Sequence, residues 1–353
     1  MSLNVLNAHT IYLAMFRYDV FQTWIKGCLH CHSSNSDGLL SPNDVVKYYK
    51  DRGYGLVAIT DHEKITIVKK CSDVIVLPGA ELSRGKGKIG FPYHLVILGI
   101  DDEYILKIRD PQEIIDYVNS LGGITIIAHP YWSGLVHEDL MNIDRYAGIE
   151  IYNTGCDLEV AKGFSTVHWD NLLSNGRLTW GYAVDDAHRY FFPPRDANGG
   201  WVWIAVNELS IESILNALRN GHFYSSMGPK IDELFISRRQ IHVRSSPFHR
   251  VNIITANGKG MCIDEITLDQ VVDIYRRGKL KGTFDEFEIV QEANITRVFL
   301  RHGGFKARIA RTPDGIQELD VQFDFSKYDY IRIEIMDRKG MFAWTNPVNV
   351  HEL

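Results

Sequence analysis

The stretch LVAITDH, residues 56–62, joins a short run of apolar, mostly branched side chains to an aspartate and a histidine. A run of this length and composition is typical of a strand buried inside a sheet. The stretch ITIIAHP, residues 124–130, has the same form. Both stretches predict a buried strand that ends in residues able to bind a metal ion.

Similar runs recur on both sides of these two stretches and alternate with helical patterns. The predicted strands are Leu56–Thr60, Val74–Leu77, His94–Leu98, Ile124–Ala128, Gly148–Tyr152, Arg177–Val184 and Trp201–Val206. The predicted helices are Pro42–Lys50, Pro111–Leu121 and Leu158–Leu173, and the first two open with a proline, whose missing N–H costs nothing there. This alternation predicts an α/β barrel or an open α/β layer around a largely parallel sheet.

The pattern changes after Gly228-Pro229. Apolar residues then alternate with polar ones, as in strands with one buried face. The clearest cases are Val321, Phe323 and Phe325, then Ile331, Ile333 and Ile335, and similar runs cover Ile241–Arg244, Val251–Thr255 and Ile295–Arg301. A helix-like segment, Leu268–Arg277, interrupts them. We therefore expect a small β-sandwich after the α/β part, with a boundary near residue 229.

Length and composition limit the possible classes of protein. The 353 residues suffice for two domains, and 45% hydrophobic and 23% charged residues are ordinary values for a globular protein. The net charge of −6 leaves no basic stripe for nucleic acid, so we expect a small-molecule substrate, with nucleic acid entering only as a nucleotide or short oligonucleotide. The oligomeric state stays open.

We expect a cytoplasmic protein without a membrane span. No run approaches the roughly 18 apolar residues that a span needs, and Ile11–Phe16 is too short for a signal peptide. The five cysteines are odd in number, and although Cys28 and Cys31 are three apart, the histidines beside them are better candidates for metal ligands. We therefore expect ordinary buried thiols at Cys28, Cys31, Cys71, Cys156 and Cys262.

Ligand-type residues collect where the predicted strands end. Asp61-His62 and His129 follow two strands directly, Glu81 comes soon after a third, and Asp186 and His188 follow a fourth. The carboxyl ends of parallel strands share one edge, which is where α/β barrels build their sites. The remaining candidates are His30 and His32, which are two apart on an extended segment, Asp37, and His94.

Each of these residues alone has an ordinary explanation. A lone histidine pair is commonly a packed core pair, Asp37-Gly38 reads as a turn, and a single carboxylate as a helix cap. Because histidines and carboxylates recur at the ends of several predicted strands, the set as a whole favours a metal site. Imidazole with carboxylate suits zinc, manganese or iron. Cations bridged by a carboxylate lower the pKa of a shared water and polarise an oxygen of the substrate.

The order of these motifs resembles the polymerase and histidinol phosphatase (PHP) superfamily of hydrolases. The motifs are G-x-L-H-x-H-S-x-x-S-D-G from Gly27, A-I-T-D-H from Ala58, P-G-A-E from Pro78, H-L-V-I-L-G from His94, A-H-P from Ala128 and D-A-H from Asp186. The resemblance implies a distorted (β/α)7 barrel over residues 26–229, after an N-terminal extension of residues 1–25. Segments 221–229 and 343–347 look like the two-domain branch with carbaryl-type ester hydrolases, which implies a β-sandwich over residues 230–353.

The resemblance also implies a multinuclear metal centre of two to three divalent ions. It gives a first ion to His30, His32, Glu81 and Asp186, a second to Glu81, His94 and His129, and a third to Asp37, His62 and His188. Asp61 is then expected to orient an imidazole. Asp185 departs from the serine that is common in the family, and it either adds a carboxylate behind the ligands or alters the pocket.

Three arginines lie beside the motifs, namely Arg84, Arg177 and Arg189. A guanidinium matches the oxygens of a phosphate, and we expect Arg84 and Arg189 in that role, although each also reads as a surface ion pair. Our leading hypothesis is a phosphoesterase that uses a metal-bridged hydroxide, with water or a nearby acid such as His94 or His188 protonating the leaving oxygen. The alternatives are a carbamate or carboxylic ester hydrolase with the same centre, and a metal-stabilised scaffold without catalysis.

Overall fold

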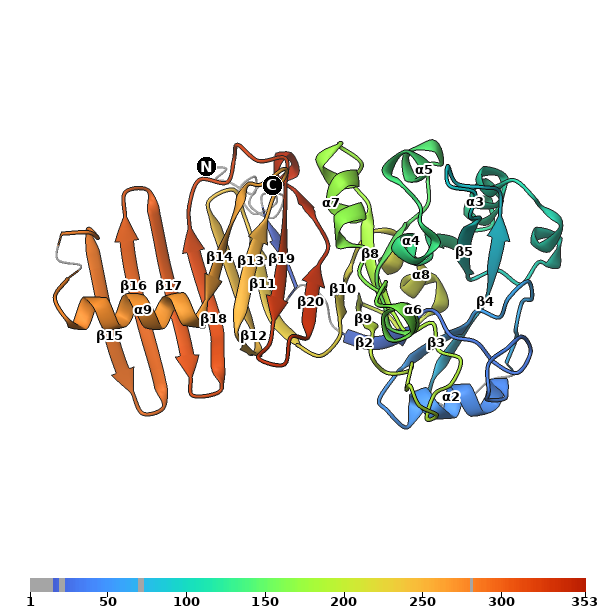
Figure 1. Ribbon diagram of the computed structural model, residues 1–353, viewed down its shortest axis with the longest axis horizontal. Helices are drawn as coiled ribbons and strands as arrows, with labels where there is room; N and C mark the ends of the chain where they lie inside the picture. The colour runs from blue at the N-terminus through green and yellow to red at the C-terminus, as the bar shows by residue number, and fades with distance from the viewer. Residues whose placement is uncertain (1–14, 19–22, 69–72, 280–281) are drawn as a thin grey trace, which may run out of the picture. The chain divides into compact units, whose positions relative to one another are not determined.

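The computed structural model describes residues 15–18, 23–68, 73–279 and 282–353 of the chain (Figure 1). The chain forms two compact units that meet in sequence between Met227 and Gly228. Strand β1 (Phe16–Arg17), in the segment expected as an N-terminal extension, pairs with the second unit. Cys71 lies outside the described residues, so its expected burial stays a prediction.

The first unit contains one sheet and the helices around it. Its strands are β2 (Thr23–Cys28), β3 (Leu56–Ile59), β4 (Ile75–Arg84), β5 (Tyr93–Leu98), β6 (Ile124–Ile127), β7 (Gly148–Asn153), β8 (Trp180–Val184), β9 (Trp201–Val206) and β10 (Phe223–Ser226). Its helices are α2 (Pro42–Lys50), the 3-10 helix η1 (Glu103–Lys107), α3 (Pro111–Ser120), α4 (Pro130–Ser133), α5 (His137–Asn142), α6 (Thr154–Val160), α7 (Thr166–Ser174) and α8 (Ile211–Arg219). No helix in the described ranges is long and apolar enough to cross a membrane.

The sheet runs in the order β10-β9-β2-β3-β4-β5-β6-β7-β8. Pairing is parallel from β2 to β4 and from β6 to β8, as expected, but β5 and β9 each run antiparallel to both of their neighbours, so the sheet is less parallel than predicted. The amino end of β5 therefore lies at the edge where β4 and β6 end. This explains how His94, the second residue of its strand, reaches the same edge as the other candidates.

A closed barrel is not seen, because β8 and β10, the outermost strands of this order within the first unit, are not paired with each other. A side chain links these two strands instead. Ser225 Oγ accepts a hydrogen bond from Ala183 N at 2.8 Å and donates one to Gly181 O at 2.7 Å. The first unit is thus a mixed α/β layer whose outer strands are joined through a serine.

Period-two alternation gives each face of the sheet its own core. On β3, Leu56 and Ala58 pack into a cluster with side chains from β6, β8, β9 and α8, while Val57 and Ile59 face the other way. That second face packs against α2, which buries Val45, Val46 and Tyr49. Strands from both ends of the sheet share the first cluster, so the sheet curves around it.

The helix expected over 158–173 is two helices, α6 and α7. Ala161, in the left-handed conformation at φ 55°, ends α6 after Val160. The chain then passes close to its own start, because Asn153 N donates to Gly163 O at 3.0 Å and a Cβ on Gly163 would lie 2.4 Å from Asp157 Cβ. The apolar periodicity predicted a helix across both segments and could not reveal this turn.

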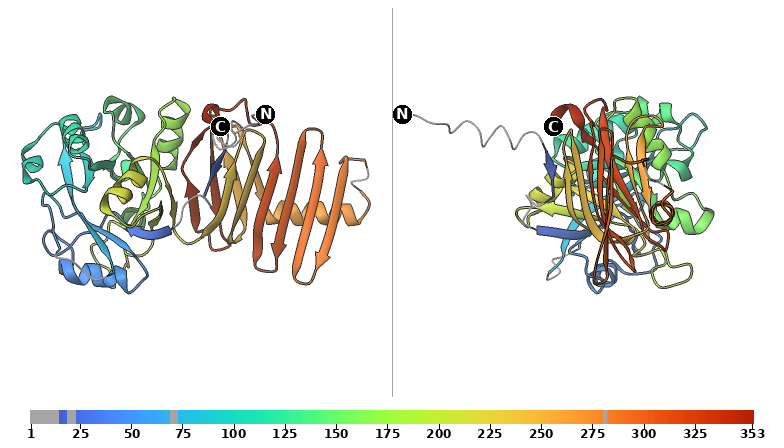
Figure 2. Two further views of the ribbon diagram at one scale, coloured as in Figure 1. Left: turned by 180° about the vertical axis from the view of Figure 1, so that it is seen from behind. Right: turned by 90° about the vertical axis from the view of Figure 1, so that its left-hand side faces the viewer.

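The described residues of the second unit form two antiparallel groups of strands, one α-helix and one 3-10 helix. One sheet has the order β1-β11-β12-β18-β17-β16-β15, and the other β14-β13-β19-β20 with β21 beside β19. The bounds are β11 (Ile231–Ile236), β12 (Gln240–Phe248), β13 (Arg250–Ile254), β14 (Gly260–Asp264), α9 (Glu265–Arg276), β15 (Glu286–Glu292), β16 (Ile295–His302), β17 (Phe305–Thr312), β18 (Gly315–Gln322), β19 (Tyr330–Met336), β20 (Phe342–Thr345), β21 (Val348–Asn349) and the 3-10 helix η2 (Val350–Glu352). Strands β15 to β18 of the larger sheet lie side by side in Figure 1 and, seen from behind, in the left panel of Figure 2.

The alternation seen in the sequence corresponds to burial only in part, because Arg332, between two of the predicted core residues, is buried as well. Ile331, Ile333 and Ile335 of β19 are fully buried, and so is Val321 of β18. The helix expected over 268–277 is α9, which Asp264 caps by accepting from Thr267 N at 2.9 Å. The period-two apolar pattern therefore located buried strand residues of this unit, and the helical pattern located its α-helix.

Gly38 is required by the turn that carries Asp37. A Cβ at this position would lie 2.3 Å from the carbonyl oxygen of His32, a distance that no side chain tolerates. We predict that Gly38→Ala destabilises the protein by about 1–3 kcal/mol, measured by urea unfolding. The control is Gly55→Ala, whose Cβ meets Ile25 at an ordinary 3.6 Å. Equal stability of the two variants would contradict the close approach.

Candidate metal centre

The two segments that carry His30, His32 and Asp186 hold each other in place. His32 N donates to Ala187 O at 2.9 Å, and Asp186 N donates to His30 O at 3.0 Å. Asp186 has a φ of 54°, a left-handed conformation that costs free energy in a residue other than glycine. The backbone pairing stabilises that conformation and directs three side chains to one point.

A second pair of segments positions Glu81 and His62. Glu81 lies in the second half of β4, which continues well past the predicted strand. Its N–H donates to Asp61 O at 3.2 Å, and its carbonyl accepts from Glu63 N at 2.9 Å. Residues 62 and 81 therefore form a parallel bridge, and their side chains leave it on the same side.

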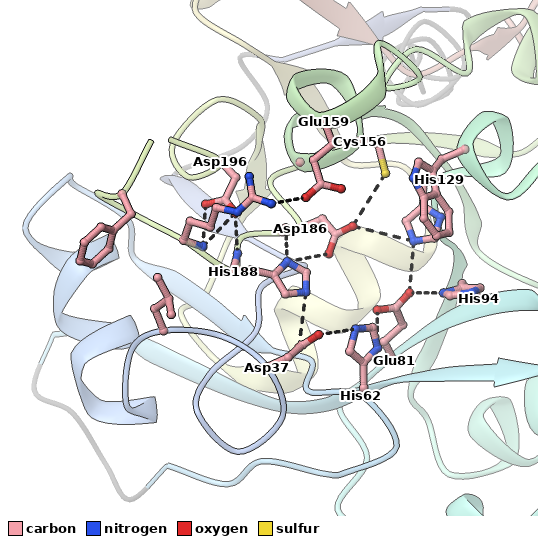
Figure 3. Close-up of a pocket in the computed structure, with 15 residues that line it drawn as sticks. Asp37, His62, Glu81, His94, His129, Cys156, Glu159, Asp186, His188 and Asp196 are labelled. Carbon is pink, nitrogen blue, oxygen red and sulfur yellow. Dashed lines mark hydrogen bonds and ion pairs between the residues drawn. The ribbon is translucent and has the colours of Figure 1, made fainter. Parts of the chain in front are cut away.

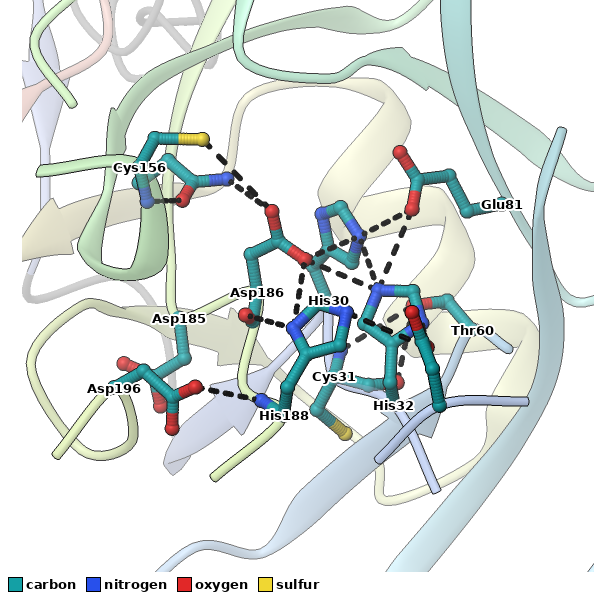
Figure 4. Close-up of polar contacts among 12 residues, drawn as sticks. His30, Cys31, His32, Thr60, Glu81, Cys156, Asp185, Asp186, His188 and Asp196 are labelled. Atoms are coloured by element: carbon teal, nitrogen blue, oxygen red, sulfur yellow. Dashed lines mark hydrogen bonds and ion pairs between the residues drawn. The ribbon is translucent and has the colours of Figure 1, made fainter. Parts of the chain in front are cut away.

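Four donor atoms form a compact set at the bottom of the site: His30 Nε2, His32 Nε2, Glu81 Oε2 and Asp186 Oδ1 (Figure 4). The two nitrogens are 3.1 Å apart. The nitrogens lie 3.2 and 3.3 Å from the Glu81 oxygen, and 3.3 and 3.0 Å from the Asp186 oxygen. All four residues are buried.

These separations fit a metal ion. Ligand atoms placed tetrahedrally at about 2.0 Å from zinc are about 3.3 Å from one another. The five distances above lie between 3.0 and 3.3 Å, so an ion fits among the four atoms with little movement. Two imidazole nitrogens and two carboxylate oxygens are also the donor chemistry that zinc, manganese and iron accept.

Glu81 belongs to a second set with His94 and His129. Its other oxygen, Oε1, lies 2.7 Å from His94 Nδ1 and 3.2 Å from His129 Nε2. One carboxylate thus places one oxygen in each of two neighbouring donor sets. That is the arrangement of a carboxylate that bridges two ions.

A third set contains Asp37, His62 and His188, together with His32. Asp37 oxygens lie 3.5 Å from both His62 Nε2 and His188 Nε2 (Figure 3). His32 Nδ1 is buried, lies 3.8 Å from Asp37 Oδ1, and has no hydrogen-bond partner among the described residues. The side chain of Asp37 is 56% exposed, whereas the first set is shielded from solvent.

The second ring nitrogen of most of these histidines has a partner that fixes the ring. His30 Nδ1 lies 2.6 Å from Glu150 Oε1, and His129 Nδ1 lies 3.0 Å from Ser133 Oγ. His188 Nδ1 donates to Asp186 O at 2.9 Å, and His94 Nε2 lies 3.3 Å from Ser83 Oγ. Partners of this kind orient metal-binding imidazoles and set their tautomer.

Buried carboxylates dominate the electrostatics of the centre. Burial opposes a charged ring, but Asp186, Glu150 and Glu81 raise the pKa of His30 well above its ordinary value. Burial likewise opposes charge on Glu81, yet the neighbouring imidazoles, His30 above all, lower its pKa well below the ordinary value. The cluster therefore requires positive charge, which either protons or divalent ions can supply.

A pocket of about 570 Å³ opens onto the second and third sets. Its lining includes Asp37, Glu81, Glu159, Asp186 and Asp196, against a single arginine, Arg189. Asp196 accepts hydrogen bonds from the N–H groups of residues 188–190, which fixes the loop that carries His188. Without bound cations this acidic pocket would repel an anionic substrate.

The three arginines beside the motifs have different surroundings in the structure. Arg189 lines the pocket and donates to Glu159 Oε1 at 2.8 Å. Arg84 is buried away from it, donating to Glu63 and to the carbonyls of Ile108, Leu106 and Ser83. Arg177 donates to the carbonyls of Leu140, Met141 and Ile143. The structure thus places Arg189 alone of the three at the pocket.

Two aspartates have roles other than those expected. Asp61 was expected to orient an imidazole, but its carboxylate accepts from Ser33, Ser36 and Thr66, and so holds the turn that leads to Asp37. Asp185 is buried outside the pocket lining and accepts from Tyr49 Oη at 2.9 Å and from the N–H groups of residues 198–200. It stabilises the loop after the site.

Glu150 is the carboxylate that the sequence interpretation missed. It lies in the middle of β7, where it accepts from His129 N at 2.8 Å in addition to contacting His30. The signal was available, because Glu150 is the single charged residue of a strand whose other residues are apolar or neutral. A lone charge in a buried strand needs a buried partner.

Comparisons with known proteins give distant likenesses. No protein-family model matches the chain. The uncharacterised protein MJ1587 of Methanocaldococcus jannaschii is 27% identical over 169 residues, which cover 43% of this chain and 88% of that protein.

Solved structures give a similar result. A two-domain protein of Bacteroides vulgatus, described as containing a predicted PHP-like metal-dependent phosphoesterase, has a TM-score of 0.49 at 13% identity, covering 92% of this chain and 95% of that one. A protein of Bifidobacterium adolescentis, described as a candidate metal-dependent phosphoesterase, has a TM-score of 0.36 at 14% identity, covering 46% and 87%. These likenesses are too distant to assign an activity to this chain.

The metal-free protein should lose stability as the pH rises. Burial lowers the pKa of His32, but the hydrogen bonds and charges of Asp186 and Glu81 outweigh it and raise the pKa to about 9. A histidine pKa that is higher in the folded state gives stability that is complete below about pH 6.5 and is lost as the pH passes 9. We predict a loss on the order of 2 kcal/mol between pH 6.5 and 9.5, measured by urea unfolding.

His32→Gln is the comparison that isolates this effect. Burial lowers the pKa of Lys26 to about 8, so Lys26 changes stability in the opposite direction over part of the same range, and equally in both proteins. The difference between wild type and variant should therefore shrink with rising pH. A difference independent of pH would contradict the role of His32.

Proposed function

We propose that this protein is a metal-dependent hydrolase of the PHP superfamily that acts on phosphate esters. One observation carries the proposal: Glu81 places one oxygen in each of two donor sets, which lie at the base of a pocket. A shared carboxylate between two cation sites is the geometry used in hydrolysis assisted by two metals. The curved sheet of the first unit then corresponds to the distorted barrel of that superfamily.

The residues present fit two to three divalent ions of zinc, manganese or iron. His30, His32, Glu81 and Asp186 would hold the first; Glu81, His94 and His129 would hold the second; and Asp37, His62 and His188, with His32 beside them, would hold the third. Bound ions lower the pKa of a water and polarise the oxygens of a phosphoryl group. All the donor groups found among the described residues lie in the first unit.

We propose that Arg189 binds the substrate. Its side chain is 38% exposed and lines the pocket, and its guanidinium donates to one exposed carboxylate, Glu159. An exposed ion pair of this kind is weak, so a phosphate oxygen can replace Glu159 at little cost. Arg189 then binds the outer oxygens of the phosphate while the ester bond faces the cluster.

Of the histidines at the open side of the cluster, we assign His94 and His188 to proton transfer. His94 is 15% exposed and His188 is 30% exposed, whereas His30 and His32 are buried. His188 donates through Nδ1 to Asp186 O, which leaves Nε2 directed to Asp37 and the pocket. With the third set empty, His188 Nε2 can carry the proton that the leaving oxygen needs; otherwise His94 or water supplies it.

The metal centre gives the first prediction for this function. Purified protein should retain two divalent ions per chain through gel filtration, with a third exchangeable because its donors are exposed. Elemental analysis measures this. Glu81→Ala should lose ions from both sets and its activity, while Glu103→Ala, which changes an exposed glutamate, should retain both. Full metal content in Glu81→Ala would refute the bridging role.

The second prediction concerns chemistry. Protein loaded with manganese or zinc should hydrolyse phosphomonoesters or phosphodiesters better than aryl carboxylic esters or carbamates, because several cations and Arg189 match a charge that is spread over several oxygens. Arg189→Gln should weaken kcat/KM by about 2 to 3 kcal/mol at unchanged metal content. Arg145→Gln is the matched control, since Arg145 is also exposed and paired with one carboxylate, Asp116.

Other outcomes of the same assay would favour one of the two alternative functions, an ester hydrolase or a scaffold without catalysis. Efficient hydrolysis of a neutral carbamate, with phosphate esters ignored and Arg189→Gln tolerated, would establish the ester hydrolase suggested by the resemblance to carbaryl-type enzymes. Bound ions with no turnover of any of the four substrate classes would favour a metal-stabilised scaffold.

A further inference from the structure

One thiol points into the metal cluster. Cys156, the third residue of α6, lines the pocket with its side chain toward Asp186 (Figure 3). Its Sγ lies 3.9 Å from Asp186 Oδ2. The sequence interpretation counted Cys156 among ordinary buried thiols, because nothing in the spacing of the cysteines linked it to the histidines.

The surrounding contacts hold this thiol in place. Asn153 Oδ1 accepts from Cys156 N at 2.9 Å, and Asn153 Nδ2 donates to Asp186 Oδ2 at 3.2 Å. Asn153 Nδ2 also donates to Glu150 Oε2 at 2.9 Å, and Gly155 N donates to Asp185 O at 2.8 Å. The start of α6 is therefore fixed to the same residues that fix the metal cluster.

Cys156 lies beside a donor set that offers three ligands, and the two groups share His129. His94, His129 and Glu81 Oε1 give three donors, and zinc prefers four. Cys156 Sγ, His129 and Asp186 form a further group whose ligand atoms all lie within 4.8 Å of one another. Asp186 Oδ2 is 3.8 Å from His129 Nε2, on the side of Asp186 that does not face the first set.

We infer that Cys156 is a ligand of the ion that His129 holds, and that its sulfur makes this position selective for zinc. A thiolate is a soft ligand that favours zinc over manganese, whereas imidazole and carboxylate accept either. The two buried positions would then differ in metal preference, because the first set offers only nitrogen and oxygen. This inference rests on the metal centre proposed above but is tested separately from it.

Cys31 is the thiol nearest to the other ligands in sequence, and its geometry argues against the same role. It lies between His30 and His32, but its Sγ donates to Ala58 O at 3.3 Å, on the side of the second core cluster. Cys156 is thus the one described cysteine that shares a donor group with the histidines.

Cobalt(II) is a spectroscopic probe for this question. Metal-free protein loaded with Co²⁺ should show visible d–d bands together with a near-ultraviolet thiolate-to-cobalt charge-transfer band. Cys156→Ser should lose the charge-transfer band and keep d–d absorption, while Cys262→Ser, which changes an exposed thiol of the other unit, should keep both. In zinc–manganese competition followed by elemental analysis, Cys156→Ser should bind zinc at least about tenfold more weakly.

The outcomes separate this inference from the proposed function. Cobalt d–d bands without a charge-transfer band in the wild type would overturn the ligation by Cys156 and leave the metal centre intact. A charge-transfer band that persists in Cys156→Ser would assign the thiolate to another cysteine and overturn it as well. Failure of the wild type to bind Co²⁺, Zn²⁺ or Mn²⁺ would remove both the centre and this ligand.

A measurement on the wild type covers the case in which Cys156→Ser does not fold. X-ray absorption at the zinc edge should show a sulfur neighbour at about 2.3 Å besides nitrogen and oxygen neighbours at about 2.0 Å. A zinc site with nitrogen and oxygen neighbours alone would overturn the inference.

Discussion

The buried carboxylate of Glu81 imposes the constraint on which the rest of the site depends. A carboxylate that is 1% exposed cannot remain charged without compensation, and it is surrounded by imidazoles from four other segments. Those segments meet because the strand ends share one edge of the sheet. The antiparallel β5 adds His94 from its amino end. The same arrangement of strands that forms the fold therefore also brings the imidazoles that balance the charge of Glu81.

Much of the fold followed from local patterns, and the differences have identifiable physical causes. The strands β3, β6 and β9 and the helix α2 lie where apolar runs and caps predicted them. The direction of β5 could not be predicted, because a buried strand has the same composition in either direction. The break between α6 and α7 depends on the contact between Gly163 and Asp157, which is a tertiary feature.

The candidate site was likewise predicted only in part from the sequence. The nine residues expected as ligands do converge, since recurrence at strand ends is a property of the sequence itself. Their roles as ligands remain a proposal. What the sequence could not supply was the orientation of residues outside the motifs. Adjacency to a motif favoured Arg84 as much as Arg189, yet the side chain of Arg84 turns into the protein to bind carbonyl groups. Glu150 and Cys156 reach the cluster from β7 and α6 without any motif of their own.

The exposure of the three donor sets has a consequence for how ions enter and leave. Asp37, His62 and His188 border the pocket, whereas His30 and His32 lie beneath it and do not contribute to its lining. In the proposed metal centre, an ion bound for the deepest set would pass these outer donors and could be held by them on the way. An ion on the outer set would then delay the escape of the inner ion. The residence time of the inner ion would therefore depend on the residues at the opening of the pocket as well as on the affinity of the deepest set.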